Sequence, residues 1–298
     1  MSPRDFTLPA PAKLNLCLKI TGRRANGYHN LQTVFQIISL QDRIRFEAAN
    51  DFEIETKLLN VSRSGIDTSL QQIDTSFQIE TEDNLIFKAA KALAEYTGTS
   101  PHGRLILEKT LPVGAGLGGG SSDAATTLLG LNALWGLNLT THELLPIASA
   151  LGADVPVFLV GKSAWAEGIG DELTPVSLPH RYYVVIQPNC FISTAEIFSH
   201  SQLTRDSPPI TIARFLKVGS GNDCEAVARK LYPEVDRALV WLYQWGPAKM
   251  TGTGSCVFLD FSTKEEAEEV GKAVPVEWTA FVTEGLNESP LLAAVADL

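Results

Sequence analysis

The sequence predicts an α+β protein, because some segments alternate apolar and polar residues while others repeat apolar residues at helical spacing. In residues 12–20 (AKLNLCLKI) every second side chain is aliphatic, which is typical of a half-buried strand: Leu14, Leu16, Leu18 and Ile20. After a glycine-rich stretch at 111–123, apolar residues recur every three or four positions, as on one face of a helix. The second half mixes strand and helix patterns without an internal repeat.

The first half of the chain continues this mixture. Strands are predicted at 34–40 and 43–47, with Gln41-Asp42 as the turn between them. Residues 57–80 are rich in Ser, Thr and Gln without a sustained period, and we expect part of them to form a mobile surface insertion. A strand is expected at 104–109, directly before the glycine-rich stretch. Before it, a helix is predicted from a stripe of four residues: Leu85, Ala89, Ala92 and Tyr96.

Beyond the glycine-rich stretch, one helix is predicted from a stripe that faces a core: Ala124, Leu128, Leu131 and Trp135. A second helix at 140–151 ends at Gly152, and a strand and turn follow in SAWAEGIGDEL. The pattern changes around 175–180, so we place a domain boundary there, giving domains 1–176 and 177–298. The elements expected in the second domain are strands at 182–186, 255–260 and 279–284 and helices near 194–199, 223–231, 234–245 and 263–272.

Charge and cysteine usage limit the classes of partner. The 298 residues carry a formal net charge of −10, so no global basic field attracts nucleic acid or an anionic membrane. A polyphosphate ligand must therefore be neutralised locally. The cysteines are far apart in the sequence and form no CxxC pair, which favours a reducing compartment over disulfides or a metal site: Cys17, Cys190, Cys224 and Cys256. Without a signal or transit pattern at Met1, we expect a bacterial cytoplasmic protein outside the membrane.

The stretch LPVGAGLGGGSSD at 111–123 predicts a phosphate site. Five of its thirteen residues are glycine, and a helix start with free N–H groups follows. Gly114, Gly116 and Gly119 match the dinucleotide fingerprint, but the acidic residue expected about 20 positions later is here Glu143, inside a predicted helix. A Walker A loop is excluded because serine, and not lysine, follows Gly120. A glycine-rich turn without a ligand is the remaining structural alternative.

Three motifs in order over about 245 residues resemble those of the GHMP kinases: Pro11-Ala-Lys13-Leu-Asn15-Leu, Pro112-x3-Gly116-Leu-Gly-Gly-Gly-Ser-Ser122 and Met250-Thr-Gly-Thr-Gly-Ser-Cys256. The resemblance implies a two-domain fold, with an N-terminal domain like the second domain of ribosomal protein S5 and ferredoxin-like α/β layers C-terminal to it. It also implies ATP with Mg²⁺. The residues that it assigns to ATP are Pro112, Gly114, Gly116, Leu117, Gly118, Gly119, Gly120, Ser121 and Ser122.

Gly27-Tyr28-His29, residues 151–158 (LGADVPVF) and Gly221-Asn-Asp223 are similar to one branch of that family, which acts in the non-mevalonate isoprenoid pathway. The resemblance implies phosphorylation of the 2-hydroxyl of a cytidine diphosphate-linked methylerythritol. Lys13 and Asp154 would be catalytic, with Asp154 accepting the hydroxyl proton and Lys13 orienting the oxygen. Taken alone, Lys13 reads as a solvated strand residue and Asp154 as a helix N-cap or turn residue before Pro156.

For the acceptor, the resemblance implies that Tyr28 and Phe198 sandwich the cytosine ring while His29 bonds its edge. Asn15 and Thr194 would lie nearby. Gly252 and Gly254 would let the backbone approach the substrate, or would simply form a tight hairpin. As alternatives, Tyr28 is an aromatic in a turn, and Phe198 is a core residue of a helix that opens with the capping box Ser193-x-x-Glu196. For magnesium, Ser122 is a candidate by resemblance, and Glu167 is an acidic residue in a suitable place.

Two other functions remain open from the sequence. The acceptor could be another small alcohol of the homoserine, galactose or mevalonate type, and Tyr28-His29 is the feature that argues against this. Alternatively, the chain could be a regulatory or dinucleotide-binding protein that holds a nucleotide without transferring phosphate. For assembly, we expect a monomer or a weak homodimer.

Overall fold

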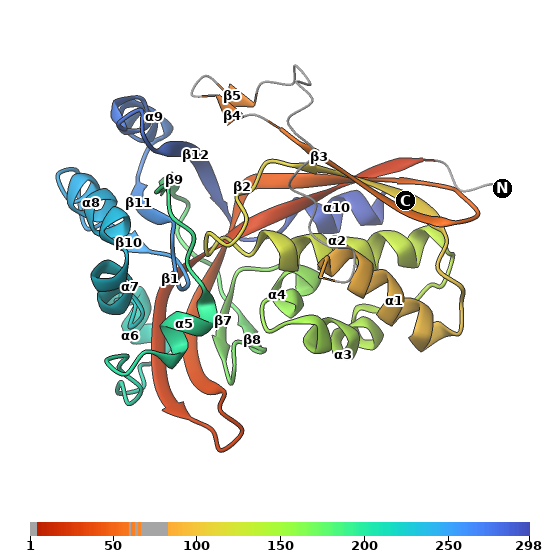
Figure 1. Ribbon diagram of the computed structural model, residues 1–298, viewed down its shortest axis with the longest axis horizontal. Helices are drawn as coiled ribbons and strands as arrows, with labels where there is room; N and C mark the ends of the chain where they lie inside the picture. Colours follow the sequence, from red (N-terminus) through yellow and green to blue (C-terminus); the bar gives the residue numbers. More distant parts are fainter. Residues whose placement is uncertain (1–4, 60, 63–64, 67–82) are drawn as a thin grey trace.

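Two long antiparallel strands, β1 (Phe6–Arg23) and β2 (His29–Glu47), cross the whole molecule (Figure 1). The computed structural model describes residues 5–59, 61–62, 65–66 and 83–298, so most of the insertion predicted at 57–80 lies outside the described residues. The hairpin places Lys13 opposite Ile37 and Arg23 opposite His29. The pairing therefore fixes the separation along the strands between Lys13 and His29.

The strands form one mixed sheet in the order β10-β11-β9-β12-β2-β6-β3, with β1 and β7 also paired to β2 and β8 paired to β7. The small pair β4 (Val61–Ser62) and β5 (Gly65–Ile66) lies apart from it. The remaining strands are β3 (Phe52–Leu58), β6 (Gly103–Lys109), β7 (Ala164–Glu167), β8 (Glu172–Pro175), β9 (Tyr182–Gln187), β10 (Lys249–Met250), β11 (Val257–Phe261) and β12 (Thr279–Leu286).

Helices cover the two halves of this sheet separately, which confirms the α+β prediction (Figure 1). In one half lie α1 (Leu85–Thr97), α2 (Gly119–Leu134), α3 (Thr141–Leu151), α4 (Val155–Val160) and α10 (Pro290–Ala296). In the other lie α5 (Thr194–Ser199), α6 (Ile212–Val218), α7 (Glu225–Leu231), α8 (Pro233–Leu242) and α9 (Lys264–Ala273). Within the described residues, every helix is too short or too polar to span a lipid bilayer.

Each half has its own apolar core. Phe46, Leu128 and Phe158 belong to the first core, and Val184, Ile186 and Leu239 belong to the second. Between the halves, β12 pairs with β2 at Gly285–Ile38 and Leu286–Ile37, and a third, smaller apolar cluster draws residues from both halves. This arrangement agrees with two folding units, while the exact boundary at 176/177 stays a prediction.

Helix α2 is buried on almost every side, and a glycine in its middle allows this. A Cβ at Gly130 would lie 2.1 Å from the ring of Phe46, so only glycine lets the helix approach β2 this closely. Leu128 and Leu131 on the same helix are fully buried, as the sequence predicted. This packing holds α2 close to the sheet. The helix begins at Gly119, inside the glycine-rich stretch.

One local prediction was wrong, and a second was wrong in part. Gln41-Asp42 is no turn, because β2 continues through both residues and Asp42 is fully buried. Its carboxylate accepts backbone N–H bonds from Thr110 and Leu111, which lie far away in the sequence. The predicted helix is confirmed as α1, and Ala89 of its stripe is buried, but Tyr96 is 55% exposed, and Ile86 and Leu93 pack inward although the stripe did not include them.

Candidate active site

A cavity of about 1830 Å³ lies where β1, the glycine-rich loop, the turn at 251–255 and helix α5 meet. Of the residues that the sequence assigned to catalysis, ATP or substrate, all line this cavity except Ser122, which is buried behind it. Segments from both halves of the chain therefore converge on one space. The individual roles of these residues stay predictions.

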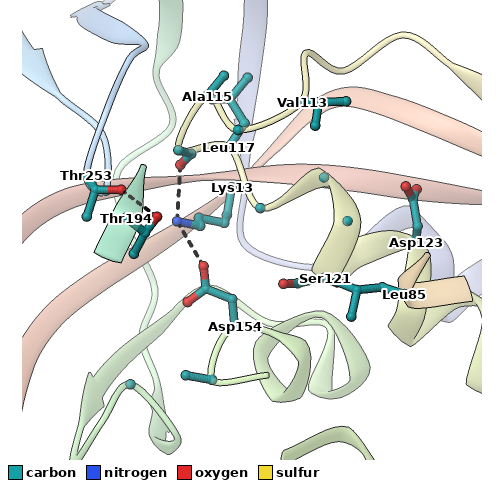
Figure 2. A pocket seen from close by; sticks show the side chains of 18 of the residues that line it. Lys13, Leu85, Val113, Ala115, Leu117, Ser121, Asp123, Asp154, Thr194 and Thr253 are labelled. Atoms are coloured by element: carbon teal, nitrogen blue, oxygen red, sulfur yellow. Dashed lines mark hydrogen bonds and ion pairs between the residues drawn. The ribbon is translucent and has the colours of Figure 1, made fainter. Parts of the chain in front are cut away.

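Lys13 is the best-fixed charge in the cavity. Its side chain is only 3% exposed, and its ammonium group donates to Asn15 Oδ1 and, at 3.1 Å, to the carbonyl of Gly116. The third neighbour is Asp154, whose Oδ2 lies 3.2 Å from Nζ (Figure 2). With three acceptors around a group that has three protons, the ammonium has one preferred position.

Asp154 lies between α3 and α4 and points toward Lys13 (Figure 2). Although it occupies the N-cap position of α4, its side chain makes no capping hydrogen bond within the described chain. Proline at the helix start removes one of the N–H groups that a cap would satisfy. The carboxylate is 35% exposed and lines the cavity, so it is available to a ligand.

The glycine-rich loop needs glycine because of its contacts as well as its backbone angles. Gly116 has φ +77°, and a Cβ there would lie 2.4 Å from the carbonyl oxygen of Thr251. Gly118, the N-cap of α2, has φ +73°, and its Cβ would meet Lys13 Cε at 3.0 Å. The loop thus packs directly on Lys13, and the N–H groups of the first turn of α2 begin beside the ammonium group.

The loop and the turn at 251–255 are tied to β1 by hydrogen bonds. The amide of Lys13 donates to the carbonyl of Leu117 at 3.0 Å, and the amide of Asn15 donates to Thr251 Oγ1 at 3.0 Å. Asn15 Nδ2 also donates to Thr33 Oγ1 at 2.8 Å. Because β1, the loop and the turn share these bonds, they hold one another in place.

The far end of the cavity carries the aromatic residues. Tyr28, in the turn between β1 and β2, is 60% exposed, whereas His29 is buried. The His29 ring stacks on Phe198 of α5 with 5.1 Å between ring centroids and 25° between planes. The structure thus brings His29 and Phe198 together and leaves Tyr28 exposed at the rim, while the predicted sandwich of a base between Tyr28 and Phe198 stays a prediction.

Thr194 and the turn at 251–255 lie between the two ends of the cavity. Thr194 Oγ1 and Thr253 Oγ1 are 3.0 Å apart (Figure 2). Gly252 and Gly254 have φ of +58° and +91°, so the turn is tight as well as close to the cavity. Both readings of these glycines, a tight turn and an open approach for a ligand, are therefore compatible with the geometry.

Comparison with known proteins gives two family matches: residues 84–162 match the GHMP kinase N-terminal domain and residues 207–278 match the GHMP kinase C-terminal domain. The chain is 47% identical over 295 residues to the 4-diphosphocytidyl-2-C-methyl-D-erythritol kinase of Marinomonas sp. (strain MWYL1), covering 99% of this chain and 92% of the relative. The chain belongs to the GHMP kinases. It is accordingly an ATP-dependent small-molecule kinase with the two-domain fold of that family.

Further relatives carry the same name. A 4-diphosphocytidyl-2-C-methyl-D-erythritol kinase of Alcanivorax borkumensis is 47% identical, covering 96% of this chain and 92% of the relative. A crystal structure of 4-(cytidine 5'-diphospho)-2C-methyl-D-erythritol kinase has a TM-score of 0.74 at 31% identity and covers 94% of this chain and all of its own. A mevalonate kinase structure, at 16% identity and a TM-score of 0.64, shares the fold.

A buried ion cluster beneath the glycine-rich loop of this kinase escaped the sequence analysis. Lys109 Nζ lies 2.6 Å from Asp42 Oδ2 and 2.7 Å from Asp123 Oδ2. Burial alone would lower the pKa of Lys109, but the two carboxylates outweigh it and hold that pKa above its usual value. Burial raises the pKa of Asp123, and the neighbouring Lys109 ammonium acts in the opposite direction. Lys109 is the last residue of β6 and Asp123 is in α2, so the cluster joins the sheet to the helix start.

The ligands available for a metal ion are few. Within the part of the chain that the structure describes, no group of three His, Cys, Asp or Glu side chains surrounds a possible metal position. Ser122 Oγ is buried with no hydrogen-bond partner among those residues. Glu167 accepts from Gln32 Nε2 at 2.8 Å and does not line the cavity. A magnesium ion would therefore depend mainly on oxygens of the ligand.

Proposed function

We propose that this kinase transfers the γ-phosphoryl group of ATP to the 2-hydroxyl of 4-diphosphocytidyl-2-C-methyl-D-erythritol, giving the 2-phosphate and ADP in the non-mevalonate isoprenoid pathway. The observation that carries the proposal is the Lys13–Asp154 pair, fixed between a phosphate-type loop and a cluster of aromatic residues in one cavity. The names of the relatives, at 47% identity over nearly the whole chain, support this acceptor.

ATP binding would divide between the loop and an apolar recess of the same cavity. The triphosphate suits residues 112–122, where glycine backbone and the N-terminus of α2 offer N–H groups. The cavity also extends along β3 and the start of α1, where Ile54, Leu85 and Phe87 line it. Charged residues of β3, such as Glu53 and Glu55, also line it. We assign the adenine ring to this recess, because the Phe87 ring and the aliphatic side chains of Ile54 and Leu85 can pack against a purine. No sequence motif marks these residues.

Magnesium fits as an ion that is carried mainly by the nucleotide. Mg²⁺ keeps several waters and usually takes one or two protein oxygens together with substrate phosphates. The unpartnered Ser122 hydroxyl, in the first turn of α2, is the protein oxygen that we assign to it. This side chain is fully buried and does not line the cavity, so it must move for the ion to reach it. When bound, the ion would neutralise charge on the transferring phosphoryl group.

Phosphoryl transfer at this site needs little covalent chemistry from the protein. The acceptor oxygen attacks the γ-phosphorus as the bond to the departing ADP oxygen breaks, and the hydroxyl proton passes to the Asp154 carboxylate. Lys13, held by Asn15 and Gly116, keeps that carboxylate in position and places a positive charge beside the reacting oxygens. Positioning therefore accounts for much of the expected catalysis.

At the other end, the cytosine ring would stack against Tyr28 and Phe198 while His29 bonds its edge. Tyr28 is 60% exposed, and Phe198, which stacks on His29 in this structure, lines the same cavity, so the base would use the Phe198 face that His29 leaves open. Stacking is worth about 1–3 kcal/mol per base. Asn15, beside Lys13, and Thr194, between the two ends, are assigned to the polyol and diphosphate part.

The proposal is tested by offering Mg-ATP with four acceptors: the diphosphocytidyl compound, homoserine, galactose and mevalonate. We expect ADP release with the first at least about 100-fold above the other three, in terms of kcat/KM, which corresponds to about 2.7 kcal/mol. Preferred turnover of any other acceptor would reject the substrate assignment but keep the kinase. If ADP is released at the same rate without any alcohol acceptor, the reaction is hydrolysis of ATP, and the proposed phosphoryl transfer to an acceptor is rejected.

We further infer the setting in which the enzyme works. Cys17, Cys190, Cys224 and Cys256 are free thiols, which supports a reducing compartment such as the bacterial cytoplasm. The expectations of two domains, 1–176 and 177–298, and of a monomer or weak homodimer without nucleic acid or membrane partners are kept as proposals. Light scattering across a tenfold range of protein concentration measures the state of assembly.

A further inference from the structure

Arg205 is a half-buried guanidinium behind the aromatic end of the cavity, and the sequence analysis did not single it out. Its Nε donates to His29 Nε2 at 3.2 Å. Its other nitrogens donate to three backbone carbonyls, those of Phe198 and His200 at 2.9 Å and that of Leu203 at 3.1 Å. One side chain thus holds both the histidine and the segment that carries Phe198.

The contact with Arg205 decides which nitrogen of His29 carries the proton. A guanidinium only donates, so the nitrogen that it meets must offer a lone pair. Nε2 is therefore the acceptor, and the neutral ring carries its hydrogen on Nδ1. Since His29 lines the cavity and Arg205 occupies Nε2, the hydrogen-bonding nitrogen left for a ligand is an N–H donor.

An Nδ1–H donor distinguishes the two pyrimidines. Cytosine presents an unprotonated N3, which accepts a hydrogen bond, whereas uracil carries a hydrogen on N3 and would set donor against donor. A mismatched buried polar pair loses its hydrogen bond and leaves both groups desolvated, which is more costly than an absent contact. The same ring with its hydrogen on Nε2 would present a lone pair at Nδ1 and accept from uracil instead.

We propose that Arg205 is a positioning residue that fixes the tautomer of His29 and thereby makes the enzyme select cytidine over uridine acceptors. The proposal rests on the proposed function, in which the base lies against His29. Arg205 does not line the cavity, so it acts through His29 and not by direct contact with the base.

The charges around His29 agree with a neutral ring. Burial lowers its pKa, and the neighbouring guanidinium groups of Arg205 and Arg23 lower it further. These two arginines, one beyond α5 and one at the end of β1, are the charged groups that act on His29 in the described chain, and both are cations. The lowered pKa favours the neutral ring, whose hydrogen lies on Nδ1.

The experiment compares Arg205→Gln with Arg205→Lys. Glutamine can accept from Nε2–H through its side-chain oxygen, which permits the other tautomer, whereas lysine only donates and preserves the Nδ1–H form. The readout is the ratio of the dissociation constants of UDP and CDP, measured by calorimetry at pH 8. Because both probes share the same diphosphate, effects on phosphate binding cancel in the ratio. Arg214→Met, at an exposed arginine of α6, is the matched control.

We expect the unaltered enzyme, Arg205→Lys and Arg214→Met to prefer CDP by about tenfold or more. Arg205→Gln should lower this preference below about threefold, and the preference should return as the pH falls below the ordinary histidine pKa of about 6.5. It returns because protonation places hydrogens on both ring nitrogens. A purely structural role would weaken CDP and UDP equally and would show no recovery at low pH.

The outcomes separate the two proposals. If the unaltered enzyme shows no preference for CDP, the cytidine acceptor of the proposed function fails. If the unaltered enzyme prefers CDP and Arg205→Gln keeps that preference, the tautomer role of Arg205 is overturned and the proposed function stands. The same conclusion follows if Arg205→Lys loses the preference to the same extent as Arg205→Gln. Circular dichroism and the melting temperature of each variant confirm that it is folded before its ratio is interpreted.

Discussion

The two ends of the cavity are built in different ways. One end, which we assign to phosphoryl transfer and call the transfer end, contains Lys13 and Asn15. These residues are 3% and 2% exposed, lie in the middle of β1 and bond to the glycine-rich loop and to the turn at 251–255. The other end, which we assign to the base of the acceptor and call the acceptor end, contains Tyr28 and Phe198. Tyr28 is 60% exposed in a turn, and Phe198 belongs to a helix of six residues. The transfer end is therefore part of the protein core, whereas the acceptor end is formed by a turn and a short helix at the edge of the core.

This difference predicts which substitutions lower the rate of phosphoryl transfer and which lower the affinity for the acceptor. Groups that are fixed by several buried bonds hold the reacting atoms in one geometry, and small displacements there are costly. Side chains on a turn and a short helix change affinity for one part of the substrate without disturbing the fold. Three substitutions test this separation.

Asp154→Asn tests the transfer end directly. Asparagine keeps the shape but cannot take a proton, so we expect kcat to fall by about 10²–10⁴-fold. Binding of ATP and of the acceptor should change by less than about threefold. Stopped assays of ADP release and calorimetric titration measure the two effects, and Asp297→Asn, at the exposed C-terminal end of α10, is the control. Near-normal turnover would remove Asp154 from its assigned role.

Gly116→Ala tests whether the loop depends on close contact with the turn at 251–255. The new Cβ would lie 2.4 Å from the Thr251 carbonyl oxygen, so the loop must move. We expect the KM for ATP to rise more than about tenfold, or 1.4 kcal/mol, with a loss of unfolding free energy of about 1–3 kcal/mol.

The matched control is Gly136→Ala. Gly136 also has a positive φ, +64°, but a Cβ there meets nothing within 4 Å. It should lose about 1–2 kcal/mol of stability through backbone strain and leave the KM for ATP unchanged. Urea unfolding and initial rates separate the two quantities. Equal KM values for both variants would show that the contact with Thr251 does not shape the ATP site.

Tyr28→Ala tests the acceptor end, and of the three substitutions we expect it to disturb the fold least. Loss of about 1–3 kcal/mol of stacking should raise the KM for the diphosphocytidyl acceptor by about 5- to 150-fold, with kcat and the KM for ATP nearly unchanged. Tyr96→Ala removes a tyrosine of similar exposure, 55%, outside the cavity and should change neither constant. An unchanged acceptor KM in Tyr28→Ala would contradict stacking.

The sequence predicted most elements and part of the residues that line the cavity, because their signals are local. Alternation marks β1, and clustered glycine before an apolar helix marks the loop. Helix α1 shows the limit of such signals. In a run as rich in alanine as KAAKALAEY, several faces are almost equally apolar, and the true one, with Ile86 and Leu93 inside, is set by packing.

Asp42 shows why the rest could not be predicted. A polar pair between two apolar runs reads as a turn, but this carboxylate is buried because Lys109, Thr110 and Leu111 bond to it across 67 to 69 positions of sequence. The same holds for Arg205, whose partner His29 is 176 positions away. Partners so distant leave no pattern in a single sequence, since only the fold brings them together.

The hairpin of β1 and β2 has a consequence for the size of the acceptor. Lys13 pairs with Ile37, and His29 lies eight residues earlier on β2, opposite Arg23. At about 3.3 Å per residue, that is roughly 25 Å of strand. Under the proposed function, the phosphorylated hydroxyl lies beside Lys13 and the recognised ring lies beside His29, so the acceptor must carry a tether between its two ends. A short alcohol would reach only one of these two residues.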